Sequence, residues 1–262
     1  MVFQFCSNGS LYDAIKKKEV LLSWKKTFKT FTQIAEALNC LHSWSPQILH
    51  RDIKTLNFLV DEYWNCKIAD LGLSRRNEDN AETLTKMRGT YQYTPPESYK
   101  KEVPYSAKSD VYSVSIVYWE LMMKCLTGDY HYPFKEHNLP MPFQILIKVA
   151  KEGIRPTFPP NCPPLLSDMI QSCWQTDPTL RPDAKQLILK IEELSKTFIE
   201  NKKEWDHLLV WKQKGNKSME SDPSTNENGT VEAESGEGMN LLNDSQSEID
   251  LGIPGEAVIG KK

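Results

Sequence analysis

The aromatic residues of this 262-residue chain stop well before its end. All 26 of them (7 Trp, 10 Tyr and 9 Phe) occur at or before Trp211, and the last 48 residues contain none. That end segment is rich in Ser, Asn, Glu and Gly, so it cannot bury enough apolar surface to offset the entropy lost on ordering. We expect a folded region to Trp211, followed by a disordered tail over 212–262.

The formal net charge of −3 conceals an uneven distribution. Residues 215–262 hold 10 acids against 3 lysines, which gives −7, so residues 1–214 carry +4. The small net charge of the whole chain argues against a protein that binds nucleic acid or an anionic membrane, because there is no strong field of a single sign to attract such a partner. The acidic tail is interpreted as solvated disorder, with an arm that binds a partner as the alternative.

Neither a membrane span nor secretion is indicated. The chain has no run of 18 apolar residues and no basic, apolar leader at its start. Its six cysteines have neither metal-ligand spacing nor the pattern of a disulfide framework. We expect reduced thiols and a cytoplasmic location.

Apolar residues recur at helical spacing in three segments, between Phe28 and Leu41, between Val111 and Met122, and between Leu187 and Phe198. Two short β-prone runs, 58–60 and 66–69, flank a polar turn and are typical of a hairpin. The sequence predicts an α+β fold that is mainly α-helical, with one small β element.

Polar residues with matching chemistry flank this hairpin. The segment HRDIKTLN occupies residues 50–57, and the segment DLG follows the second run at residues 70–72. An aspartate and an asparagine supply the oxygen ligands that a hard cation prefers. A second aspartate can accept a hydroxyl proton, and a lysine can neutralise phosphate charge. Together these groups suit metal-assisted phosphoryl transfer.

Each of these residues alone has an ordinary explanation. Asp52 fits a turn or a helix cap, Lys54 fits a surface charge, and the segment at 70–72 fits a simple turn. The joint order and spacing favour the catalytic interpretation.

This arrangement resembles the protein kinase family, whose catalytic loop reads H-R-D-x-K-x-x-N and whose metal-binding element reads D-F-G. The resemblance extends to GTYQYTPPE at 89–97, which is similar to the loop ending in A-P-E, and to SDVYS at 109–113. The segment CWQTDPTLRP at 173–182 is similar to an element near the end of the kinase domain. We identify residues 1 to about 198 as similar to this family, within its tyrosine kinase-like branch.

The resemblance implies ATP and Mg²⁺ as cofactors and a protein as substrate. Asp52 would accept the substrate proton and Lys54 would contact the transferred phosphate, while Asn57 and Asp70 would bind Mg²⁺. The remaining implied positions fall into three groups: nucleotide-binding residues Phe3, Gln4, Phe5, Cys6 and Leu59; substrate-loop residues Thr90 and Tyr93; and structural residues His50, Arg51, Leu71, Glu97, Asp110 and Arg181. Of the structural set, Glu97 and Arg181 would form a buried ion pair, and Leu71 would pack with His50 in an apolar column between lobes.

The resemblance also bears on specificity and regulation. Lys54 and Thr90 match the serine/threonine pattern, whereas the Cys173–Trp174 element looks like the tyrosine kinase branches, so dual specificity stays open. Arg51 next to Asp52 implies a contact with a phosphorylated loop residue. Thr83 and Thr85 are the candidate phosphorylation sites.

The chain as written lacks most of a kinase N-lobe. Residues 1–10 resemble its last strand and the hinge, residues 11–211 resemble the C-lobe, and no Gly-rich phosphate loop occurs. Three interpretations compete: a fragment of an active serine/threonine kinase, a lone C-lobe acting as a scaffold or binding module, and a chain that completes its site with another chain. The intact set of Asp52, Asn57 and Asp70 favours the first.

Overall fold

The computed structural model describes residues 4–76, 91–99 and 103–217, with side chains through Gln213. Within these ranges helices predominate, and four short strands form two separate two-stranded sheets. This confirms the mainly helical α+β class. The predicted positions Phe3, Thr83, Thr85 and Thr90 lie outside the described residues, as does the chain beyond Lys217.

The helices occur in the order α1 Leu11–Lys16, α2 Trp24–His42, α3 Ala107–Thr127, α4 Gln144–Lys151, α5 Pro164–Cys173, α6 Ala184–Glu200, α7 Lys202–His207 and α8 Val210–Lys217. The strands are β1 Ile48–Leu49, β2 Phe58–Val60, β3 Cys66–Ile68 and β4 Arg75–Arg76. Strands β2 and β3 form the expected antiparallel hairpin, and β1 pairs with β4 in the same sense. The three helices predicted from apolar spacing correspond to α2, α3 and α6.

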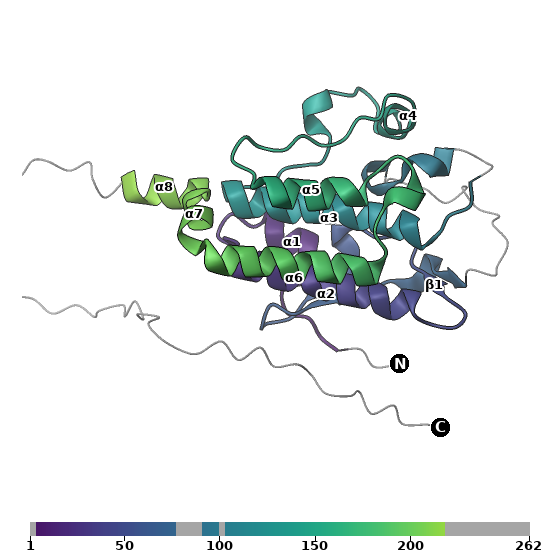
Figure 1. The fold of residues 1–262 in the computed structure, drawn as a ribbon, viewed down its shortest axis with the longest axis horizontal. Coiled ribbons are helices and arrows are strands. Elements are labelled where there is room, and N and C mark those ends of the chain that lie inside the picture. Colours follow the sequence, from purple (N-terminus) through teal and green to yellow (C-terminus); the bar gives the residue numbers. More distant parts are fainter. Residues whose placement is uncertain (1–3, 77–90, 100–102, 218–262) are drawn as a thin grey trace, which may run out of the picture. The chain divides into compact units, whose positions relative to one another are not determined.

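Helices α2 and α6 lie side by side along one face of the folded part, with α3 and α5 behind and above them in the view of Figure 1. Ser23 caps α2 by accepting from the amide of Lys26 at 3.3 Å, and Asp183 caps α6 by accepting from the amide of Gln186 at 2.7 Å. The aromatic rings between these helices and α7 pack against one another in stacked, tilted and edge-to-face pairs: Trp24, Phe28, Phe198 and Trp205. Because these rings are buried on one face of each helix, the apolar residues of α2 and α6 recur at regular helical spacing.

Helix α3 forms the centre of the core. Eighteen of its 21 residues are buried, including polar ones, which a surface helix would not tolerate. Its C-terminal cap is Gly128, at a φ of +81° that favours glycine. A side chain at this position would also lie 3.0 Å from Trp211, so the helix end fits only glycine.

The segment before α1 runs along the hairpin. The amide of Asn8 donates to the carbonyl of Val60 at 3.0 Å, and Val60 donates back to Gly9 at 2.9 Å. Residues 4–6 are not in a strand, contrary to the strand that we expected to begin the chain. A strand is defined by hydrogen bonds to a neighbour, and in the described part of this segment backbone pairing begins only at the residues that reach β2.

Helix α8 extends past the boundary that the aromatic residues suggested. It continues to Lys217, six residues beyond Trp211. The indole of Trp211 donates to the carbonyl of Cys125 at 2.8 Å and contacts Gly128, which fixes this helix to the end of α3. Residues 212–217 are therefore helical and are not part of the expected tail.

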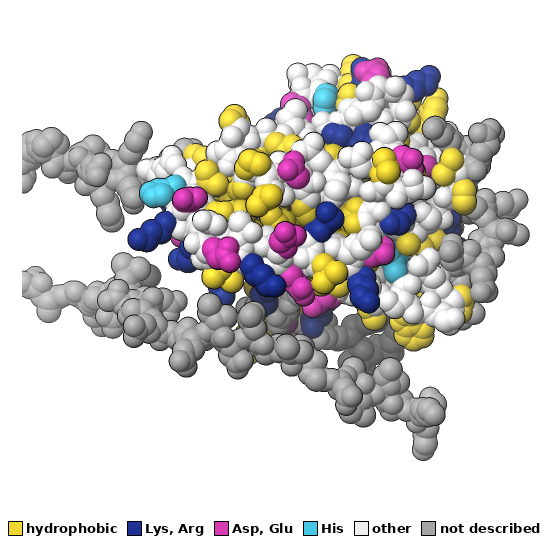
Figure 2. Space-filling model, viewed as in Figure 1, with side chains coloured by type: hydrophobic (Ala, Val, Ile, Leu, Met, Phe, Trp, Pro, Cys, Tyr) yellow, Lys and Arg dark blue, Asp and Glu magenta, His cyan; other side chains and the backbone are white. Residues whose placement is uncertain are grey.

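The face viewed in Figure 2 mixes charges of both signs with scattered apolar side chains, and no single-sign patch dominates it. None of the helices in the described ranges is both long enough and apolar enough to span a bilayer. All six cysteines lie in these ranges and are free thiols.

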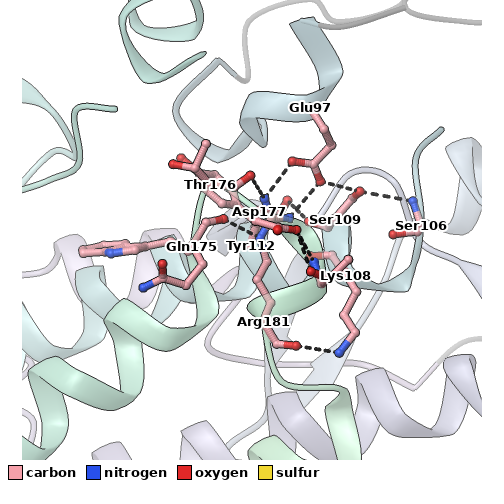
Figure 3. Close-up of polar contacts among 12 residues, drawn as sticks. Glu97, Ser106, Lys108, Ser109, Tyr112, Gln175, Thr176, Asp177 and Arg181 are labelled. Atoms are coloured by element: carbon pink, nitrogen blue, oxygen red, sulfur yellow. Dashed lines mark hydrogen bonds and ion pairs between the residues drawn. The ribbon is translucent and has the colours of Figure 1, made fainter. Parts of the chain in front are cut away.

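We expect that removing the hydroxyl of Tyr112, on α3, stabilises the folded protein. Among the described residues this hydroxyl is the buried side-chain oxygen without a hydrogen-bond partner, and burial raises its pKa to about 12. The guanidinium groups of Arg155 and Arg181 lie 5.2 and 5.1 Å from the centroid of the Tyr112 ring, and Figure 3 shows Arg181 beside it. Because Tyr112→Phe keeps the ring and removes only the unpaired group, it should raise the free energy of unfolding by about 1 kcal/mol.

Chemical denaturation measures this change, with Tyr118→Phe on the same helix as the matched control. The Tyr118 hydroxyl donates to the carbonyl of Phe31 at 2.7 Å, so its removal should lower stability by about 1 kcal/mol. Equal losses in the two variants would show that the Tyr112 hydroxyl has a partner after all.

Candidate functional site

The loop at residues 50–57 brings three predicted residues into contact. The ammonium group of Lys54 lies 2.6 Å from Oδ2 of Asp52. The amide Nδ2 of Asn57 donates to the same Oδ2 at 2.8 Å and to the backbone carbonyl of Asp52 at 2.7 Å. A 3₁₀ turn, Thr55–Asn57, returns the chain so that Asn57 reaches Asp52. Both side-chain donors use Oδ2, which leaves Oδ1 of Asp52 for a further ligand.

His50 joins this loop to the end of β3. Its buried ring places Nε2 3.1 Å from the carbonyl of Ala69, and the amide of Asp52 donates to Nδ1 at 3.3 Å. Because a carbonyl only accepts and an amide only donates, His50 is the neutral tautomer with its proton on Nε2. The amide of Ala69 also donates to the carbonyl of Asn57 at 2.8 Å. These bonds hold Asp70, the next residue, beside the loop.

Asp110 on α3 organises the start of the loop. Its carboxylate accepts from the amides of His50 and Arg51 at 2.9 and 3.0 Å, from the Tyr105 hydroxyl at 2.6 Å, and lies 2.9 Å from Nε2 of His42. Desolvation of this fully buried group acts to raise its pKa, but the hydrogen bond and charge of His42, with the other donors, hold the pKa below its usual value. The anchored residue Arg51 adopts a left-handed φ of +70°.

Asp70 occupies a turn that positions its carboxylate at the surface. Its φ is +60°, and its Oδ1 accepts from the amide of Gly72 at 3.2 Å, capping the turn Leu71–Leu73. A side-chain carbon at Gly72 would lie 3.0 Å from that oxygen, so glycine fits best here.

Leu71 is more exposed than we expected for a residue of the apolar column. It is 51% exposed in the described structure, whereas His50 is fully buried. The turn at Asp70 directs the chain away from the core at this point, and the described residues leave half of Leu71 to solvent. Its packing against an upper lobe stays a prediction.

Glu97 and Arg181 form the buried pair that the resemblance implied. The two guanidinium nitrogens of Arg181 lie 2.8 and 2.7 Å from the two carboxylate oxygens of Glu97, with both side chains 3% exposed or less (Figure 3). Arg181 also donates to the backbone carbonyls of Gln175 and Lys108 at 2.7 and 2.9 Å. The pair thereby links the segment after residue 91, the start of α3 and the turn before α6.

Comparison with known proteins decides the family. Residues 1–191 match the family described as protein tyrosine and serine/threonine kinases. The chain belongs to the protein kinase family.

Its relatives include kinases of both named specificities. The chain is 42% identical over 212 residues to stress-activated protein kinase alpha of Dictyostelium discoideum, covering 80% of this chain and 33% of the relative. It is 34% identical to serine/threonine-protein kinase STY17 of Arabidopsis thaliana, with 74% and 32% covered, and 30% identical to a probable tyrosine-protein kinase of D. discoideum, with 80% and 64% covered. The chain thus spans a third or less of the length of the first two of these relatives.

Within this kinase chain, two of the predicted nucleotide-binding residues, Cys6 and Leu59, lie at the hairpin edge. Half-buried Leu59 pairs with Ser10 in an isolated bridge, and the amide of Gly9 donates to the carbonyl of Cys6 at 3.0 Å. Cys6 is partly buried, whereas Gln4 is exposed and Phe5 is 84% exposed. Cys6 and Leu59 are therefore brought to the same edge, and the nucleotide role of all four residues stays a prediction.

Arg51 has a described partner of its own. Its guanidinium lies over the ring of Tyr105 at 5.6 Å from the centroid. The phosphorylation sites that it was expected to contact, Thr83 and Thr85, lie outside the described residues.

Three residues that the sequence did not single out form a polar cluster with Tyr93 next to the loop at 50–57: Thr55, Glu120 and Tyr130. Glu120 is fully buried on α3, where Tyr93 and Tyr130 donate to it at 2.8 Å each. A glutamate within an otherwise apolar helical stripe was the available signal, since a buried acid requires partners. The predicted substrate-loop residue Tyr93 is thus bonded to a residue that the sequence left unassigned.

Proposed function

We propose that this chain carries the catalytic loop of a protein kinase that transfers a phosphoryl group from ATP to serine or threonine hydroxyls of proteins. The observation that supports it most is the contact of Asp52 with both Lys54 and Asn57, at 2.6 and 2.8 Å. A turn or surface role would not require these three side chains to converge.

Asp52 would accept the proton of the substrate hydroxyl. Its Oδ2 is held by two donors, which fixes the carboxylate and leaves Oδ1 to receive the hydroxyl. Lys54 would exchange its contact with Asp52 for one with the transferred phosphate. Such an exchange would neutralise developing charge without moving the loop.

Asn57 and Asp70 fit a magnesium ion by the chemistry of their oxygens. The Nδ2 atom of Asn57 is engaged by Asp52, so its amide oxygen remains for a cation, and Asp70 offers an exposed carboxylate. Bound Mg²⁺ would neutralise charge on the ATP phosphates. The carbonyl and amide of Ala69 hold Asp70 near Asn57 through His50 and the loop backbone.

Lys54, two residues after Asp52, supports serine and threonine as acceptors, as do the names of several relatives. The relative named as a probable tyrosine-protein kinase keeps dual specificity as an outcome of the assay. Phosphoamino-acid analysis of a labelled protein substrate distinguishes these acceptors.

Asp52→Asn should lower the phosphoryl-transfer rate roughly 10²- to 10⁴-fold, because the general base is removed. Its thermal stabilisation by Mg²⁺–ATP should persist, since the ligand oxygens remain. Asp70→Ala should abolish that stabilisation. Both are measured in this chain and in any longer form of the protein.

A stabilisation by Mg²⁺–ATP of equal size in wild type and Asp70→Ala would contradict the assigned ion site. Absence of both stabilisation and transfer in every form would favour a non-catalytic binding module instead.

A further inference from the structure

The carboxyl group of Glu120, on the buried helix α3, hydrogen-bonds to residues of three separate segments, one of which is the catalytic loop. The Tyr93 hydroxyl donates to Oε2 of Glu120 at 2.8 Å, and the Tyr130 hydroxyl donates to Oε1 at 2.8 Å. The Thr55 hydroxyl lies 3.3 Å from Oε1 and 3.1 Å from the Tyr93 oxygen. Thr55 belongs to the catalytic loop, Tyr93 to residues 91–99 and Tyr130 to the segment after α3.

The number of protons in this cluster indicates the state of Glu120. Four oxygen–oxygen contacts lie within hydrogen-bonding distance, and each needs one proton. Three hydroxyls supply three protons, so an ionised carboxylate would leave one of the two contacts of Thr55, to Glu120 or to Tyr93, without a proton. A protonated carboxyl can donate to Thr55, which then donates to Tyr93. All four contacts are satisfied only when Glu120 carries its proton.

The electrostatics agree with this count. Desolvation raises the pKa of Glu120 to about 8, and its three hydroxyl donors lower it only in part. Among the residues that the structure describes, the other titratable groups around it are phenols: Tyr93, Tyr130, Tyr132 and, against the ring of Tyr130 at 5.4 Å, Tyr12. Burial raises the pKa of Tyr93 and Tyr130, so these stay neutral while Glu120 titrates.

We propose that protonated Glu120 and Tyr130 are positioning residues that hold the catalytic loop and the loop at 91–99 in a fixed relation. The roles of the two loops rest on the proposed function. Thr55 lies one residue after Lys54, so a displacement at Thr55 reaches the Asp52 contacts directly. Tyr130 closes the cluster from outside and is not part of the catalytic machinery itself.

Hydrogen exchange at two backbone amides tests this proposal. The amide of Asn57 donates to Lys54, and that of Thr94 donates to Tyr91, so each reports opening of one loop. After correction for intrinsic rates, Tyr130→Phe should speed exchange at both amides about fivefold at pH 7, because one hydrogen bond to Glu120 is lost. Glu120→Gln should stay within about threefold of wild type, since its amide donates and accepts as the neutral acid does.

The pH profile separates positioning from mere stability. As the pH rises from 6 to 9, exchange at both amides should rise about tenfold in wild type and level off above about pH 8, because Glu120 releases its proton more readily when the loops open; exchange should stay constant in Glu120→Gln. Tyr118→Phe removes the buried hydroxyl on α3 that donates to Phe31 of α2. This variant should leave the exchange rates of both amides unchanged.

Three outcomes would overturn the proposal: rapid exchange in Glu120→Gln at pH 7, unchanged exchange in Tyr130→Phe, or the same pH profile in wild type and Glu120→Gln. None of these measurements needs nucleotide or phosphoryl transfer, so they remain decisive whether or not the chain is active.

Discussion

Replacing Arg181 with alanine should lower the free energy of unfolding by about 3–5 kcal/mol. The substitution leaves the carboxylate of Glu97 buried without its cation, which costs far more than an intact pair contributes. It also removes donors from the carbonyls of Gln175 and Lys108. Glu97→Ala should cost a similar amount, because it strands the guanidinium.

Urea denaturation of both single variants and the double variant measures the coupling. The double variant should lose much less than the sum of the two single losses, because neither charge is then left unpaired. Lys148→Ala is the matched control: its pair with Glu152 is solvent-exposed, so the change should be within about 1 kcal/mol. A loss below about 1 kcal/mol for Arg181→Ala would show that water replaces Arg181 as the partner of the Glu97 carboxylate.

Asp110→Asn should destabilise the chain by about 3 kcal/mol and loosen the loop at 50–57. All four neighbours of Asp110 present hydrogens to it, so an amide nitrogen at one position would face donors. Arg51 would lose the bond that holds its left-handed backbone, and opening should spread to Asp52.

The pH dependence of the free energy of unfolding also tests the role of Asp110. Because its pKa is lower in the folded state than in the unfolded chain, its stabilisation is complete above about pH 4 and is lost as the pH falls through the folded-state pKa. Asp110→Asn should therefore show a weaker loss of stability in acid than wild type. Asp183→Asn, which conserves an exposed helix cap, should change stability by less than about 0.5 kcal/mol. Equal acid sensitivity in wild type and Asp110→Asn would contradict the buried-anchor role.

Helix positions were predictable from the sequence because burial on one face imposes a local period. The stripe from Phe28 to Leu41 became α2, and the two β-prone runs became the β2–β3 hairpin. The boundary after Trp211 was placed too early, since the helix α8 continues to Lys217 and Trp211 bonds it to the end of α3. No local pattern reveals a contact 86 residues away in the chain.

Membership of the kinase family could be predicted from the sequence, because the order and spacing of Asp52, Asn57 and Asp70 are properties of the chain. How these groups are held is visible only in the folded structure. The proton count around Glu120 and the anchoring of Arg51 by Asp110 depend on angles and distances between distant segments. Hydrogen bonds act over about 3 Å in space regardless of separation along the chain, so their partners emerge only once the helices have packed.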